Sequence, residues 1–150
     1  MRIGIANDHG GVELKNELVK YLESLGHSVI NYGCDTEDVV DAIDYAEKAC
    51  RDFINKKTDT AILICKTGVA MSVAANKIKG VRCAKIDNVV QAAQCKVHDD
   101  SNVITLASFN GIDENKKIVK AYLDAEFSRL ERYVRRLKKL EELEEKENNK

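Results

Sequence analysis

The sequence predicts an α/β protein: a doubly wound, three-layer α/β/α sandwich with a five-stranded parallel sheet and a C-terminal helical extension. Short apolar runs alternate with segments whose apolar residues recur at helical spacing. A parallel sheet explains this alternation, because each crossover helix must bury its apolar stripe against a face of the sheet. A chain of 150 residues, 44% of them hydrophobic, is long enough for one core of ordinary size.

The first part of the chain contains two strand patterns and two helical ones. Residues 1–6 form an apolar strand pattern, and a helical pattern follows over residues 12–25 after a polar, glycine-containing loop. Residues 28–32 are typical of a second strand, which ends at Gly33. A polar segment then leads to a predicted helix over residues 41–55.

The middle of the chain repeats the alternation. Residues 60–64 predict the third strand and residues 69–77 its helix. Residues 81–86 predict the fourth strand, residues 88–97 the next helix and residues 103–107 the fifth strand. Together these patterns supply the five strands of the predicted sheet.

The terminal segment is predicted to be helical throughout. Two helices are expected, over residues 113–127 and 128–147, with residues 148–150 fraying. We therefore divide the chain into a Rossmann-like domain, residues 1–127, and a C-terminal helix of the same domain, residues 128–147. On that helix an apolar stripe is formed by Leu130, Val134, Leu137 and Leu140. An apolar stripe is expected to be buried, either against a partner subunit or against the helix's own domain.

Composition narrows the possible partners. The chain has 24 basic and 25 acidic side chains, which gives no general attraction to nucleic acid or to an anionic membrane surface. No apolar run reaches the roughly 18 residues of a membrane-spanning helix. The five cysteines are scattered and contain no Cys-x-x-Cys pair, which argues against a disulfide framework and a zinc site. We expect a cytoplasmic protein whose partner is a small molecule or another protein.

The turn after the third strand pattern carries the chemistry. The apolar run stops at Cys65, passes through Lys66, Thr67 and Gly68, and resumes at helical spacing. Such a turn presents a thiol, a hydroxyl and backbone N–H groups at the start of a helix, where anions bind and thiolates form more readily. Lys66 adds a cation beside the thiol. Taken alone, a buried Cys is more often a small apolar core residue.

Two groups of polar residues are expected at opposite ends of the sheet. Asp8 and His9 follow the first strand and Cys65 follows the third, so these residues can share one cleft at the carboxyl ends of the strands. Asp8 and His9 can equally serve to cap the first helix. His98 precedes the fifth strand and lies at the other end, so we expect it to reach the cleft only of a second subunit.

An ordered set of motifs along nearly the whole chain resembles the ribose-5-phosphate isomerase B family, which includes galactose-6-phosphate isomerase subunits. The matching segments are residues 7–11, 41 with 44–46, 64–68 with 71–72 and 74–77, 80–82, and 98–100 with 102–103. The resemblance implies an aldose–ketose isomerase of phosphorylated sugars, without metal or cofactor, that works through an enediolate. It also implies a homodimer, with a tetramer left open, whose active sites lie at the subunit interface.

The resemblance implies catalytic roles for three residues. Cys65 matches the general base that moves a proton between C2 and C1, and His98 matches the acid or base that opens the sugar ring. Thr67 would face the developing oxyanion. The backbone N–H groups that would join it belong to Gly68, Val69 and Ala70.

The resemblance also implies the substrate contacts. Asp8 would bind sugar hydroxyls, and His9, Arg132 and Arg136 match the phosphate binders. The two arginines are spaced i,i+4 on the terminal helix, and planar guanidinium groups suit phosphate oxygens. Lys66 and Asp99 stand at two further substrate-binding positions of the family.

Several positions depart from the family pattern, and they gather around the sugar. Lys66 and Ala70 replace glycines, and Ala42-Ile43 replaces a Tyr-Pro pair. Asp99 replaces an Asn, and an Arg after the last strand is replaced near Phe109. These changes leave open a five- or six-carbon sugar other than ribose 5-phosphate. They also leave open a noncatalytic sugar-phosphate-binding or regulatory homologue, or one subunit of a galactose-6-phosphate-type isomerase. A nucleotide-binding protein ranks low because no G-x-G-x-x-G or Walker motif occurs.

Overall fold

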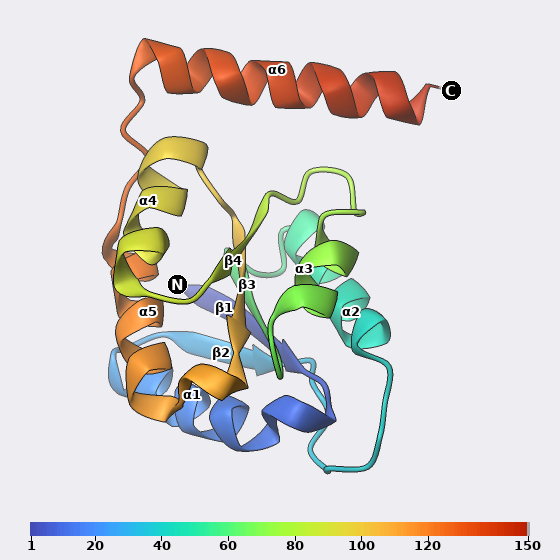
Figure 1. Ribbon diagram of the computed structural model, residues 1–150, viewed down its shortest axis with the longest axis vertical. Coiled ribbons are helices and arrows are strands. Elements are labelled where there is room, and N and C mark those ends of the chain that lie inside the picture. The colour runs from blue at the N-terminus through green and yellow to red at the C-terminus, as the bar shows by residue number, and fades with distance from the viewer. Residues whose placement is uncertain (150) are drawn as a thin grey trace.

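The computed structural model, which describes residues 1–149, is a five-stranded parallel sheet covered by helices on both faces (Figure 1). The strand order is β2-β1-β3-β5-β4. The strands are β1 (Arg2–Asn7), β2 (Ser28–Asn31), β3 (Thr60–Cys65), β4 (Cys83–Ile86) and β5 (Val103–Ala107). The predicted doubly wound α/β sandwich is confirmed.

The helices connect the strands in the predicted order. They are η1 (His9–Gly11), α1 (Val12–Ser24), α2 (Ala42–Ile54), α3 (Val69–Ala75), α4 (Val89–Asp99), η2 (Ser108–Asn110), α5 (Ile112–Asp124) and α6 (Glu131–Asn148). The expected continuous helical pair at the end of the chain is wrong in one respect: residues 125–130 are not helical. There the Ser128 N–H donates to the Val97 carbonyl and Arg129 takes a left-handed conformation, so the segment is held against α4. Lys150, the end of the tail expected to fray, lies outside the described residues.

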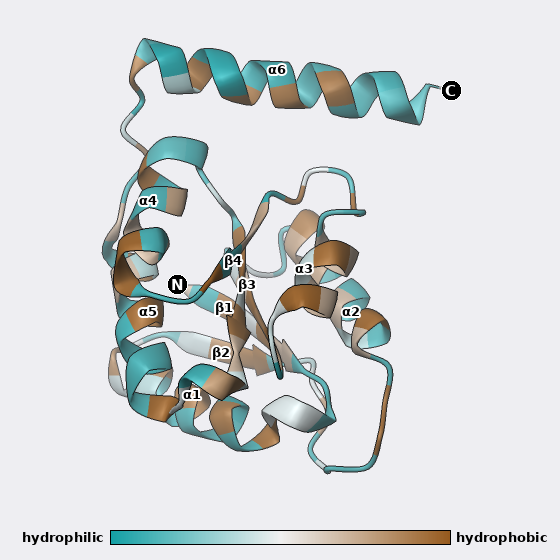
Figure 2. Ribbon diagram, viewed as in Figure 1, coloured by the Kyte–Doolittle hydropathy of each residue, from teal (hydrophilic) through white to brown (hydrophobic). Residues whose placement is uncertain are grey.

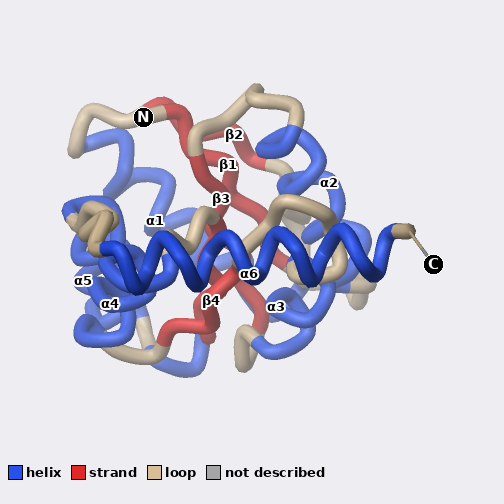
Figure 3. The backbone as a smooth tube through the Cα atoms, turned by 90° about the horizontal axis from the view of Figure 1, so that it is seen from above, coloured by secondary structure: helices blue, strands red, loops and turns tan. Residues whose placement is uncertain are grey.

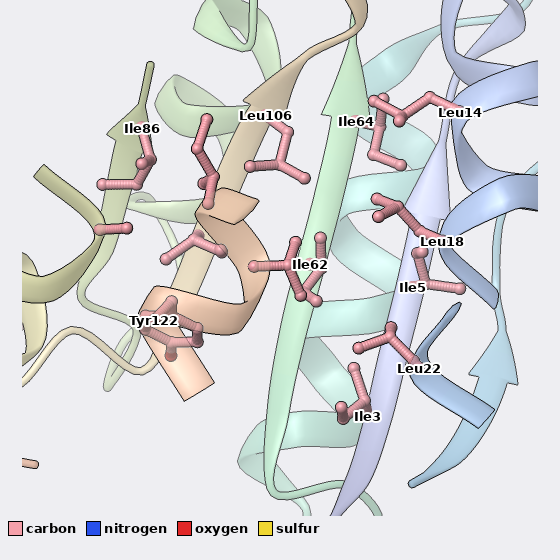
Figure 4. Close-up of a cluster of buried hydrophobic side chains, with 14 of the residues drawn as sticks. Ile3, Ile5, Leu14, Leu18, Leu22, Ile62, Ile64, Ile86, Leu106 and Tyr122 are labelled. Carbon is pink, nitrogen blue, oxygen red and sulfur yellow. The ribbon is translucent and has the colours of Figure 1, made fainter. Parts of the chain in front are cut away.

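Two cores lie on the two faces of the sheet. On one face, Leu14, Leu18 and Leu22 of α1 point at isoleucines of β1 and β3, as Figure 4 shows, and Tyr122 of α5 closes the same cluster. On the other face, small residues of α2 and α3 pack against Leu63, Cys65 and Val103. Because β3 is buried on both faces, its end is a fixed platform for the loop that follows.

The C-terminal helix α6 stands apart from this sandwich. It crosses the end of the molecule at which the strands begin and runs over the full width of the domain (Figure 3). None of its residues is buried, and hydrophobic and hydrophilic residues alternate along its ribbon (Figure 2). It is tied to the domain through the loop before β4, where Gly80 N–H donates to the Glu144 carboxylate and Lys79 pairs with Glu145 at 2.5 Å.

Candidate active site

The loop after β1 is joined to the end of β3. The Asp8 N–H donates to the Ile64 carbonyl at 3.2 Å, and the Asp8 carboxylate accepts the Gly10 N–H at 2.9 Å. Asp8 is therefore the N-cap of the short helix η1, whereas α1, the helix that Asp8 and His9 were expected to cap, has Gly11 as its N-cap with no side-chain hydrogen bond. The His9 ring is held from the other side, because its Nδ1 accepts the Val40 N–H at 3.2 Å. The loops after β1 and β3 are adjacent, as predicted.

Cys65 ends β3 and is 4% exposed. Its side chain packs with Ala6, Leu63 and Met71 of the second core, while its sulfur accepts the Gly68 N–H at 3.1 Å. That hydrogen bond holds the sulfur against the turn that follows β3. The thiol is therefore nearly buried but still anchored to the polar turn, whose next two side chains are exposed.

The turn closes through a left-handed glycine. Gly68 has φ +80°, and a Cβ there would approach Thr105 Oγ1 to 3.3 Å, so only glycine suits the position. Lys66 does not have a positive φ, which removes the strain expected for a lysine in place of a glycine. The Thr67 hydroxyl accepts the Val69 N–H at 3.3 Å. Of the expected oxyanion donors, the Gly68 and Val69 N–H groups are thus engaged within the turn.

A second cluster of side chains surrounds Tyr133, a residue that was not predicted from the sequence. The His98 ring stacks on the Tyr133 ring with centroids 4.8 Å apart, and the Arg132 and Arg136 guanidinium groups lie 4.8 and 5.5 Å from the same ring. The residue spacing is the signal that was available, since Tyr133 lies one residue after Arg132 and three before Arg136. Asp99, beside His98, is exposed. The cluster joins the last turn of α4 to the first turns of α6.

The two clusters lie at opposite ends of the sheet. Thr60 Oγ1 donates to the Asn102 carbonyl at 2.8 Å, so the turn between α4 and β5 lies at the first residue of β3. Cys65 is the last residue of that strand, five steps of about 3.3 Å, or roughly 16 Å, away. The structure therefore brings His98, Arg132 and Arg136 together, and Asp8, His9 and Cys65 together, but does not bring the two sets to one site within a chain.

Comparison with known proteins decides the family. Residues 3–140 match the sequence profile of the family described as Ribose/Galactose Isomerase. The chain belongs to the ribose/galactose isomerase family. The predicted resemblance is thereby confirmed, and membership places the chain among the aldose–ketose isomerases, which are intramolecular oxidoreductases.

Individual members of this isomerase family align over most of the chain. Ribose-5-phosphate isomerase B of Escherichia coli is 35% identical over 127 residues, which cover 84% of this chain and 85% of that protein. The structure of Clostridium thermocellum ribose-5-phosphate isomerase B superposes with a TM-score of 0.94 at 37% identity, covering 97% and 99% of the two chains. The Mycoplasma genitalium ribose-5-phosphate isomerase B, solved with bound ribulose-5-phosphate, gives 0.90 at 35% identity, covering 96% of each chain.

Two further observations concern metal binding and membrane insertion. Within residues 1–149, no three His, Cys, Asp or Glu side chains form a cluster that could hold a metal ion. In the same part of the chain, no helix is both long and apolar enough to cross a membrane.

Proposed function

We propose that this chain interconverts ribose 5-phosphate and ribulose 5-phosphate, or a related five- or six-carbon aldose and ketose phosphate, through an enediolate. The proposal rests on one observation: the candidate functional side chains fall into two separate sets, and neither set contains all the groups that the reaction needs. One set, at the carboxyl ends of the strands, holds a thiol and sugar-binding groups. The other holds an imidazole and a pair of guanidinium groups. Each set lacks what the other supplies.

A homodimer would unite the two sets. A general base and a ring-opening acid must both reach one small substrate within hydrogen-bond distance, and within one chain they lie toward opposite ends of β3, a strand roughly 16 Å long. The uncovered apolar residues of α6 favour such a partner, because an exposed helical stripe of this kind gains free energy when a second surface covers it. They are Leu130, Val134, Leu140 and Leu143. In a two-fold dimer each chain would lend its α4–α6 set to the other chain's cleft.

The set around Cys65 would perform the proton transfer. The Cys65 sulfur, which accepts the Gly68 N–H, would act as the base, taking the C2 proton and returning it to C1. The Thr67 hydroxyl already accepts the Val69 N–H, so its own proton remains to donate to the enediolate oxygen. Asp8 is fixed by its bond to Gly10 and would orient sugar hydroxyls. The reaction moves the C2 proton to C1 and the O2 hydroxyl proton to O1 and releases no group, so the thiolate is regenerated at the end of each turnover.

The set around Tyr133 would open the sugar ring and hold the phosphate. His98 would exchange a proton with the ring oxygen, a role that suits an imidazole at neutral pH. Arg132 and Arg136 share the Tyr133 face and can offer several N–H donors to a phosphate dianion. The five unpaired cysteines suit a reducing compartment, and we propose the cytoplasm.

The proposal is tested first by turnover and then by subunit mixing. Purified protein is incubated with five- and six-carbon aldose phosphates, and ketose formation is followed. Cys65→Ala should abolish exchange of the C2 proton with solvent while sparing phosphosugar binding. Retained exchange in that variant would refute the assigned base. Phosphosugar-induced thermal stabilisation without turnover of any sugar would instead favour a noncatalytic binding protein.

Subunit mixing tests whether the two sets come from different chains. Cys65→Ala and His98→Asn are each expected to be inactive, but their dimers, dissociated and reassociated together, should regain activity. Half of randomly formed dimers are mixed, and each mixed dimer carries one intact site, so about one quarter of wild-type activity is expected. The double variant Cys65→Ala/His98→Asn mixed equally with wild type is the control. Its mixed dimers contain no intact site, so only the wild-type homodimers, one quarter of all dimers, stay active, whereas sites built within one chain would leave half of the activity. No recovery in the first mixture would contradict the shared site.

A further inference from the structure

Lys15 is buried inside the domain, with 1% of its surface exposed. Its ammonium donates to the Cys34 carbonyl at 2.9 Å and to the Asp35 carboxylate at 2.5 Å. Burying an ammonium group costs free energy unless its hydrogens find acceptors, so the two acceptors are held in place by the lysine. Both acceptors lie in residues 32–41, which connect β2 to α2 and are called the connecting segment below.

The start of the connecting segment is packed against the end of β1. The Cys34 carbonyl that binds Lys15 also accepts the Asn7 side-chain amide at 3.0 Å. Asn7 directly precedes Asp8, and its amide also donates to the Asp8 carbonyl at 2.8 Å. One carbonyl oxygen therefore ties together the buried ammonium, the connecting segment and Asn7, the residue next to Asp8.

The far end of the same segment orients His9. Val40 donates its N–H to His9 Nδ1 at 3.2 Å. Because Nδ1 accepts this bond, the neutral imidazole must carry its proton on Nε2. An Nε2–H group is a hydrogen-bond donor and suits an oxygen of a phosphate group. The connecting segment is thus held at its start by Lys15 and in turn fixes which nitrogen of His9 is the donor.

We infer that Lys15 is a positioning residue: through the connecting segment, its buried ammonium sets the orientation and the Nε2–H tautomer of His9 for a phosphate oxygen. The phosphate role rests on the proposed function. The tautomer does not, because it follows from contacts within one chain and can be measured without substrate.

The first experiment measures the His9 ring directly. Long-range proton–nitrogen correlation spectra of nitrogen-15-labelled protein without substrate should show His9 with a protonated Nε2 and an unprotonated Nδ1. In Lys15→Met the two tautomers should become mixed, and the Val40 amide should exchange with solvent faster. Lys20→Met is the matched control, because Lys20 lies on the exposed face of the same helix and pairs only loosely with Glu17, at 3.8 Å. An unchanged His9 spectrum in folded Lys15→Met would overturn the inference.

The second experiment uses kinetics. Lys15→Met should raise KM for the phosphosugar about tenfold with a much smaller change in kcat, because it disturbs a binding contact and not the proton transfer. In a His9→Gln background the same substitution should add nothing further. An equal additional loss in that background would mean that Lys15 acts only on stability.

If Lys15→Met does not fold, Asp35→Asn replaces it, since the Asp35 side chain is 72% exposed and its loss weakens only one of the two bonds. A Nε2–H His9 and an unchanged KM in Asp35→Asn would then contradict the inference.

Discussion

The His98 ring lies flat against the Tyr133 ring, with an angle of 18° between the planes and 4.8 Å between the centroids. His98 lies in the last turn of α4 and Tyr133 in the first turn of α6, so this stack joins two helices through residues 35 positions apart in the chain. Both arginines proposed to bind phosphate lie over the same tyrosine. Tyr133 therefore assembles the set that one chain would contribute to its partner's cleft.

Removing the Tyr133 ring should weaken substrate binding. Tyr133→Leu takes away one stacking and two cation–π contacts, and we expect KM for the phosphosugar to rise about five- to tenfold. Tyr133→Phe keeps the ring and loses only the long hydrogen bond from Arg132, of 3.4 Å, so it should behave almost as wild type. Steady-state kinetics of the two variants decide the point. Equal effects would show that the hydroxyl, and not the ring, is what matters.

The cysteines should differ in reactivity. Burial raises the pKa of the Cys34, Cys83 and Cys95 thiols, and it raises the pKa of Cys50 to about 12, so these four stay protonated at pH 8. We expect iodoacetamide to modify Cys65 first and to inactivate the enzyme in step, as measured by peptide mass spectrometry. Added phosphosugar should slow both processes. Modification of another cysteine in parallel with inactivation would count against the assigned base.

Stability at alkaline pH should depend on Tyr32. Burial, with a 2.6 Å hydrogen bond to Asp52, raises the pKa of Tyr32 from 10.0 to about 12. A raised pKa in the folded state contributes stability that is fully present below pH 10 and is lost as the pH rises toward 12. Tyr32→Phe should lower the free energy of unfolding by about 1 kcal/mol at pH 7 and should flatten its decline between pH 10 and 12.

Urea unfolding at several pH values measures this effect. Tyr21→Phe is the control, because the Tyr21 hydroxyl makes no hydrogen bond within residues 1–149. If Tyr32→Phe and wild type lose stability in parallel above pH 10, another group causes the alkaline decline.

Gly33→Ala should be more damaging than its small size suggests. A Cβ at residue 33 would lie 1.9 Å from Asn7 Oδ1 and 2.7 Å from the Asn7 backbone nitrogen, so the end of β1 would have to move. We expect a loss of more than about 2 kcal/mol in the free energy of unfolding. Gly26→Ala separates this clash from backbone strain, since Gly26 has φ +92° with open space around it and should cost about 1 kcal/mol. Similar losses for both variants in urea unfolding would rule out the clash.

The periodicity of the sequence was enough to predict every strand and almost every helix. Apolar runs and helical stripes are local patterns, and burial on both faces leaves few alternatives to a parallel sheet. The boundary that failed lies at residues 125–130, where a hydrogen bond from Ser128 to Val97 overrides a locally helical sequence. Such a contact joins residues 31 positions apart and leaves no trace in spacing.

The candidate site divides in the same way. By itself the sequence determined the fold, the adjacent loops that carry Asp8 and Cys65, and the placement of His98 at the opposite end of the sheet. Only the tertiary structure decided that Tyr133 gathers His98 and the arginines, that Lys66 is accommodated without a left-handed backbone, and that Lys15 is buried with its ammonium bound to the connecting segment. These depend on side chains that meet through space, and the direction of a side chain is set by its neighbours in the packed protein rather than by its place in the chain.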